Sequence, residues 1–202
     1  MIIPYDGKEA FLNRLIESVF GDLNIYASDL YQMTNRCILS PTNNAVDDVN
    51  QIIIDRFPKD PHVYISSDRT LNEKDQGDYE DFLNSLSPKG LPPHKLILKE
   101  NCPVILPRNL NPMEGLCNGT RLICRDSGTT LFVQRLQWTL DDVGIYLREP
   151  VFSHGQLYVA LSRAKSSSAV KVLIVPATYR DTVTECKTRN VVFDEVLTLA
   201  KQ

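Results

Sequence analysis

The residues with the clearest chemical potential lie in one stretch, residues 152–165, which reads FSHGQLYVALSRAK. Arg163 stands near its end, two helical turns after Gln156. A guanidinium held on a rigid helix is suited to neutralise the charge that builds on a phosphate during its transfer. A lone arginine on a helix is more often a solvated surface residue, so this stretch alone leaves both interpretations open. Its apolar spacing predicts an amphipathic helix whose buried face consists of Leu157, Ala160, Leu161 and Ala164.

The usual glycine-rich signatures of nucleotide binding are missing from the sequence. There is no GxxxxGK loop followed by Ser or Thr, no GxGxxG turn and no GxSxG nucleophile turn. Residues 191–195 (VVFDE) look like a strand that ends in a magnesium-binding acidic pair. That interpretation needs a phosphate loop upstream, so we interpret the segment as a helix start or part of a tail.

No group of side chains has the spacing of a metal site. The three histidines lie far apart and the five cysteines form no CxxC pair, so we expect no bound metal and reduced thiols. The carboxylates of Asp47 and Asp48, like those of Asp141 and Asp142, are adjacent in sequence and do not face each other on a helix or strand. We expect these four side chains to be solvated.

Predicted helices and strands must hold these candidate residues in place. Residues 9–20 have the apolar spacing of a helix, and residues 36–40 read as a short buried strand. Thr42 or Asn43 can cap a following helix whose apolar face extends to Phe57. A strand, a polar turn and a helix begin an α/β unit.

The middle of the chain shifts to a β pattern. Residues 63–65 form a further strand candidate, and the segments KLILK, PVILP, RLIC and TLFVQ between residues 95 and 134 predict a small antiparallel or barrel-like unit. The segments at 143–147 (VGIYL) and 170–175 (VKVLIV) predict buried strands that return to the α/β part. A helix is expected near 193–200.

Composition excludes several classes of protein. The 202 residues are 43% hydrophobic and 23% charged, which excludes a disordered or fibrous chain. No apolar run has the roughly 20 residues of a membrane span, and no secretory signal is recognisable. We therefore expect an intracellular protein without a membrane partner. The net charge of −3 divides into −6 for residues 1–100 and +3 for residues 101–202, a weak indication of a nucleic-acid surface in the second half.

Several segments together resemble one family. GQLYVALSRAKS (155–166) resembles motif VI of superfamily 1 DNA helicases, and its context is similar to the Pif-one-type helicases, including those of Helitron transposons. Residues 36–54 resemble the first strand and helix of that family's second RecA-like domain. Residues 81–123 resemble the stretch that leads into its inserted small β domain, and 139–156 the strand before motif VI. The resemblance covers residues 35–175.

The resemblance implies a role for particular residues. Arg163 corresponds to the motif VI arginine that reaches the γ-phosphate of ATP, and Gln156 to a polar residue near ATP that helps to position it. Thr42 and Asn43 correspond to a polar turn near single-stranded DNA. Arg108 and Arg121, in the stretch that leads into the inserted β domain, are further candidates for contact with DNA.

The resemblance also implies what is lacking. The first RecA-like domain, with its phosphate loop and magnesium-binding acid, is expected to be supplied elsewhere. The β insert is shortened and motif V is missing. We therefore expect an ATP-dependent DNA helicase, moving 5′ to 3′ with ATP and Mg²⁺ in the full enzyme, of which this chain alone is inactive. Its partners are then single-stranded DNA, bound weakly, and a first RecA-like domain. The alternatives are a non-catalytic DNA-binding or interaction module and a decayed transposon remnant.

The expected fold class is α/β, a second RecA-like domain with a shortened small β insert. The expected organisation is an N-terminal helical lead-in (1–30), a RecA-like domain (31–66 and 139–180), a truncated β insert (78–135) and a tail (181–202). The family suggests roles in DNA repair, recombination and telomere maintenance. It also suggests a nuclear location, with the mitochondrion as the alternative.

Overall fold

The computed structural model describes residues 1–5, 10–27, 33–66, 81–82, 93–125, 130–133, 140–176, 188 and 190–191. The expected helix near 193–200, most of the polar stretch 66–81 and nearly all of the tail lie outside these residues. The chain divides into two compact units. The first contains residues 1–25, 31–56 and 137–202, and the second contains residues 26–30 and 57–136.

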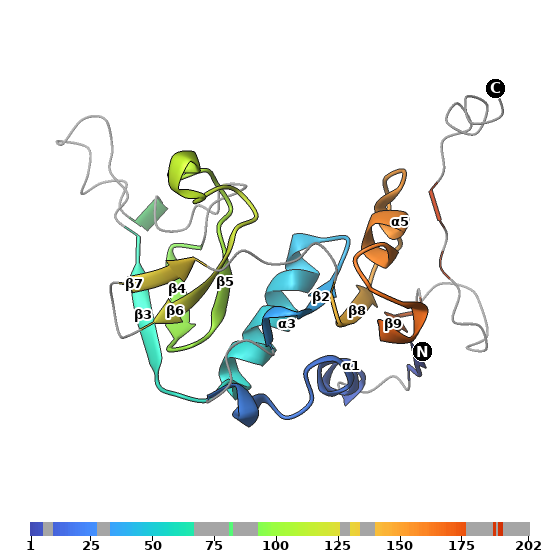
Figure 1. Cartoon of the computed structure of the whole chain (residues 1–202). Coiled ribbons are helices and arrows are strands. Elements are labelled where there is room, and N and C mark those ends of the chain that lie inside the picture. Colours follow the sequence, from blue (N-terminus) through green and yellow to red (C-terminus); the bar gives the residue numbers. More distant parts are fainter. Residues whose placement is uncertain are drawn as a thin grey trace, which may run out of the picture. The chain divides into compact units, whose positions relative to one another are not determined.

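The first unit is built on a four-stranded parallel sheet (Figure 1). Its strand order is β1-β9-β8-β2, and every neighbouring pair is parallel. The strands are β1 (Ile2–Ile3), β2 (Arg36–Leu39), β8 (Asp142–Leu147) and β9 (Val170–Ile174). The central strand β8 is buried from Val143 to Leu147, as expected of a parallel strand covered on both faces. The expectation of an α/β fold is confirmed.

Helices cover both faces of this sheet. Alternate residues of a strand point to opposite faces. On one face, Gly144 lies against Leu15 and Val19 of α1 (Ala10–Phe20). On the other face, the odd-numbered residues of β8 form a core with Val151, Val170 and Ile174, against which Leu157, Ala160 and Ala164 pack. The first two of these belong to α5 (Gln156–Leu161).

The third helix of this unit, α3 (Asn43–Arg56), follows β2. Val46 N–H donates to the Thr42 carbonyl oxygen at 3.2 Å, which makes Thr42 the N-cap residue. Ala45 and Val49 are its buried residues, whereas Ile52 and Ile53 of the expected apolar face are only half-buried.

Two expectations about side chains in this unit are wrong. Leu161 remains 45% exposed, because α5 ends there, at the edge of the buried row of side chains. Asp142 is not solvated: its carboxylate lies 2.9 Å from Arg36 and 2.5 Å from Lys171, at the start of β8 between β2 and β9. Register placed these charges together, since Asp142 pairs with Arg36 across the parallel ladder.

The second unit contains two antiparallel sheets. One joins β3 (Pro61–Ile65) to β4 (Lys95–Lys99), and the other has the order β5 (Pro103–Ile105), β6 (Arg121–Arg125) and β7 (Thr130–Val133). The antiparallel pattern was expected, but β3 was assigned from sequence to the RecA-like part. Its pairing with β4 places it in the second unit.

A long turn between β5 and β6 is held by its own hydrogen bonds. The Thr120 hydroxyl donates to the Gly115 carbonyl oxygen at 2.9 Å and accepts from Cys117 N–H at 3.1 Å. The Asn109 side chain accepts from Asn118 N–H at 2.8 Å. The Asn109 and Thr120 side chains therefore fix the turn, which is the role that polar turn residues commonly have.

No helix among the described residues is long and apolar enough to span a membrane. Within the same residues, no group of three or more His, Cys, Asp or Glu side chains could hold a metal ion.

Candidate functional site

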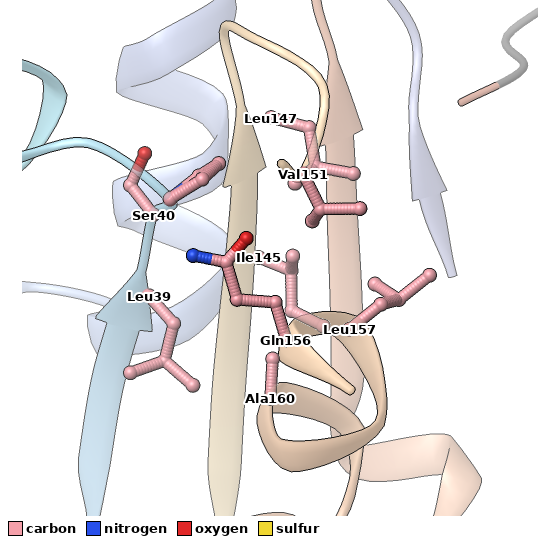
Figure 2. A pocket seen from close by; sticks show the side chains of 9 residues that line it. Leu39, Ser40, Ile145, Leu147, Val151, Gln156, Leu157 and Ala160 are labelled. Carbon is pink, nitrogen blue, oxygen red and sulfur yellow. The ribbon is translucent and has the colours of Figure 1, made fainter. Parts of the chain in front are cut away.

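The carboxyl ends of β2 and β8 enclose a small hollow in the first unit, beside the N-terminus of α5 (Figure 2). In open parallel sheets, ligands bind at the carboxyl ends of the strands. The hollow has a volume of about 60 Å³, far below the several hundred Å³ of a nucleotide-sized pocket. A hollow of this volume is too small to enclose a nucleotide. Its lining is mostly apolar and consists of Leu39, Ser40, Pro41, Ile145, Leu147, Val151, Gln156, Leu157 and Ala160.

Gln156 is the principal polar side chain at this hollow. Its Oε1 accepts hydrogen bonds from the N–H groups of Phe152 and Ser153, at 3.1 and 3.2 Å. These bonds close the turn that leads into α5, where Gly155 adopts φ +73. Figure 2 shows the Gln156 side chain extending from α5 toward the turn that holds Ser40. The residue thus closes the loop before α5 and lines the hollow together with Leu39 and Ser40 at the end of β2.

The polar turn after β2 lies at the same edge. The Ser40 hydroxyl donates to the Tyr146 carbonyl oxygen at 2.9 Å, which fixes this turn to β8. Thr42 is half-buried and Asn43 is exposed at the start of α3. Arg148, just after β8, pairs with Asp48 in the first turns of α3 at 2.6 Å. Sequence reasoning missed Ser40 and the Arg148–Asp48 pair, because neither pairing leaves a sequence signal.

Arg163 lies at the other end of α5 from Gln156. Its carbonyl oxygen accepts from Leu140 N–H at 2.7 Å, and Lys165 N–H donates to the Leu140 carbonyl oxygen at 3.1 Å. The bridge between Leu140 and Ala164 is parallel. Two backbone bonds thus fix the segment that carries the Arg163 guanidinium, and the side chain is half-buried.

An ion pair reinforces this segment. The Lys165 ammonium contacts the Asp141 carboxylate, and this hydrogen bond holds the pKa of Asp141 below its usual value. The expectation that Asp141 is simply solvated missed this contact, because Asp141 and Lys165 are 24 residues apart in sequence.

The structure therefore brings Gln156, Thr42 and the hollow to one edge of the sheet and places Arg163 at the far end of α5.

The two candidate arginines of the second unit, Arg108 and Arg121, lie at the β5–β6 connection. Arg121 begins β6 opposite Ile105, and it is half-buried. Arg108 is exposed in the turn that follows β5. The same turn exposes two apolar side chains, Leu110 (69%) and Met113 (97%).

Comparison with known proteins gives two findings. A family model described as "DNA helicase Pif1, 2B domain" matches residues 81–125. The fold is similar to the crystal structure of Pif1 helicase from Candida albicans, with a TM-score of 0.51 and 19% sequence identity. That match covers 96% of this chain and 58% of the other, so the chain spans little more than half the length of the solved protein. Among curated proteins, none matches.

Proposed function

Because the chain resembles a Pif1-type helicase in sequence over residues 81–125 and in fold over nearly its whole length, we propose that it forms part of an ATP-dependent DNA helicase. In this proposal the first unit is the second RecA-like domain, and the second unit is the shortened β insert. The enzyme would couple ATP hydrolysis to movement along single-stranded DNA in the 5′ to 3′ direction, in the nucleus.

The observation that carries the proposal is the fixed position of Arg163. Its backbone is held to Leu140 by a 2.7 Å hydrogen bond, next to a parallel sheet of the kind on which nucleotide-driven motors are built. A rigidly placed guanidinium can stabilise the charge on a transferring phosphate. An arginine in this role raises turnover by a factor of about 10³–10⁵.

The residues of this chain do not fit Mg²⁺-ATP on their own. The sequence contains no phosphate-binding loop, and the described residues include no cluster of metal-binding side chains. ATP and Mg²⁺ must therefore be held chiefly by a first RecA-like domain outside these 202 residues. This chain contributes Arg163 to that nucleotide, and Gln156 shapes the loop at the start of the same helix.

An apolar surface formed by α5 and the loop before it supports such a partner domain. Phe152 (67% exposed), Tyr158 (74%), Val159 (48%) and Leu161 (45%) present large side chains to solvent around one short helix. Exposed apolar groups of this size are typical of interaction surfaces. Covering them with a first RecA-like domain would bring that domain against the helix that leads to Arg163.

Single-stranded DNA is the proposed track of this enzyme. Thr42 caps α3 and Asn43 begins it, so exposed backbone N–H groups and short polar side chains are available there for phosphates. In the second unit, Arg108 and Arg121 provide positive charge. With a net charge of −3, the chain alone is expected to bind DNA weakly.

The proposal is tested by measuring ATP hydrolysis with and without an added first RecA-like domain of a Pif1-type helicase. We expect no turnover by the 202-residue chain alone and DNA-stimulated turnover by the pair. Arg163→Ala should lower turnover by about 10³-fold or more while DNA affinity stays unchanged. Arg56→Ala, an arginine of the same unit in the last turn of α3, is the matched control. DNA-stimulated hydrolysis by the chain alone would overturn the assignment of the nucleotide cradle to another domain.

A non-catalytic DNA-binding module is the second candidate, and the absence of a phosphate-binding loop from the sequence favours it. It predicts DNA binding that weakens steeply with salt but does not respond to ATP, even when a first RecA-like domain is present. A decayed remnant would instead show no cooperative unfolding transition.

A further inference from the structure

Two cysteines of the second unit meet at the junction between β4 and β5. The chain turns there through Asn101 and Cys102, and both of these residues face one residue of β6, Cys124. Asn101 N–H donates to the Cys124 carbonyl oxygen at 2.6 Å, and Cys124 N–H donates to the Cys102 carbonyl oxygen at 2.9 Å. Asn101 has φ +72. This combination of bonds and left-handed backbone defines a G1 bulge with Cys102 directly opposite Cys124.

The register places the two thiols side by side. Pro103 pairs with Ile123 in the adjoining ladder, so Cys102 and Cys124 form the next cross-strand pair and share one face of the sheet. Directly opposed residues of antiparallel strands have Cα atoms about 4.5–5.5 Å apart, within the range of about 4.4–6.8 Å that a disulfide spans. Both side chains are buried, with 4% and 7% exposed, and the thiols hydrogen-bond to each other.

We propose that Cys102 and Cys124 are a site of oxidative modification that forms an intramolecular disulfide with a peroxide as the oxidant. The Cys124 thiolate attacks one peroxide oxygen, the O–O bond breaks, and the departing hydroxide takes a proton to become water. The Cys124 sulfenic acid that results is attacked by the Cys102 sulfur, which loses its proton as the S–O bond breaks and a second water leaves. Two thiols are oxidised to one disulfide, and one peroxide is reduced to two waters.

The surroundings assign different roles to the two thiols. Burial raises the pKa of Cys102 to about 11, and it also raises the pKa of Cys124. The hydrogen bond between the thiols acts in opposite directions, since it lowers the pKa of Cys124 and raises that of Cys102. The hydrogen bond thus favours the thiolate of Cys124 over that of Cys102, so in the proposal Cys124 reacts with peroxide and Cys102 is the resolving thiol. Because both thiols are buried, peroxide reaches them only after local opening of β5. This strand can open because it has three residues and lies at the edge of the sheet β5-β6-β7.

The disulfide would close the ring of residues 102–124, which contains all of the turn between β5 and β6. A cross-link that closes a loop of this length restricts the unfolded chain and stabilises the folded one. This inference stands on the second unit alone and does not depend on the proposed helicase activity.

The test treats the full chain with hydrogen peroxide, blocks the remaining thiols with iodoacetamide and maps the tryptic peptides by mass spectrometry. Trypsin separates the cysteines, since Cys102 falls in Glu100–Arg108, Cys117 in Asn109–Arg121 and Cys124 in Leu122–Arg125. We expect the first and third peptides to appear linked, with the loss of two hydrogen atoms, and to separate after reduction. The oxidised chain should melt about 5 °C or more above the reduced chain.

Two variants keep the proposal falsifiable. Cys102→Ala should abolish both the linked peptide and the thermal shift, whereas Cys117→Ser should leave both unchanged. Free thiols at Cys102 and Cys124 after complete oxidation of Cys117, or linkage of Cys124 to another cysteine, would overturn the proposal. A linked chain with an unchanged or lower melting temperature would overturn the stabilising role of the bond.

Discussion

Gly144 is the position at which a single methyl group should most clearly disturb the first unit. A Cβ added there would lie 2.8 Å from Ile38 Cγ1, 2.9 Å from Val19 Cγ2 and 3.3 Å from Leu15 Cδ1. Ordinary contacts between carbon atoms are about 3.5–4.0 Å. Gly144→Ala therefore requires α1 to move away from β8 or requires buried side chains to leave their preferred rotamers.

The magnitude follows from two opposing effects. Overpacking a dense core costs about 1–3 kcal/mol. Replacing glycine with alanine in a strand recovers about 0.5–1 kcal/mol, because the unfolded chain loses conformational freedom. Val19 and Leu15 are fully buried, so relaxation is limited and the cost should prevail. We expect a net loss of about 1–2 kcal/mol in the free energy of unfolding, which lowers the melting temperature by roughly 2–8 °C.

The assay is urea unfolding followed by circular dichroism, in a double-mutant cycle with Val19→Ala. Truncating Val19 removes the clashing Cγ2, so this substitution should cost about 1 kcal/mol less in the Gly144→Ala background than in the wild type. A Gly144→Ala chain as stable as the wild type, or additive effects of the two substitutions, would refute the close approach of α1 to β8.

The remaining predictions concern charge and hydrogen bonding. The folded chain holds the pKa of Cys102 near 11, above the value of about 9 for a free thiol, so the stability it contributes is complete below pH 9 and is lost as the pH rises through 11. The free energy of unfolding from urea titrations between pH 8.5 and 11 should fall further in the wild type than in Cys102→Ala, by about 2–3 kcal/mol at most. Parallel profiles would contradict this. Asp142→Asn removes a half-buried carboxylate from two cations, Arg36 and Lys171, and should cost about 1.5–3 kcal/mol. Asp48→Asn, whose ion pair is half-exposed, should cost less than about 1 kcal/mol. Gln156→Ala should accelerate hydrogen exchange of the 152 and 153 N–H groups, and Gln156→Glu, which keeps an acceptor oxygen, should restore protection; equal exchange in both variants would count against the observed bonds.

Local patterns predicted much of the fold. The apolar spacing of residues 9–20 predicted α1, and the short apolar run 36–40 predicted β2, because both signals depend on neighbouring residues. The strands 143–147 and 170–175 were also predicted, although the pairing of β8 with β9 was not. Pairing depends on which residues meet across the sheet. Strands were predicted at 63–65 and at KLILK, which are β3 and β4, but their pairing with each other was not.

The candidate site divides in the same way. The sequence by itself indicated the helicase-like family, and that resemblance made Arg163, Gln156 and Thr42 candidate site residues. Only the tertiary structure decided that Gln156 and Thr42 lie at one edge of the sheet while Arg163 is held at the opposite end of α5. It also decided that Cys102 meets Cys124. These arrangements rest on the register between strands far apart in the chain, and a one-residue shift in register, which no local pattern encodes, would reverse which side chains meet.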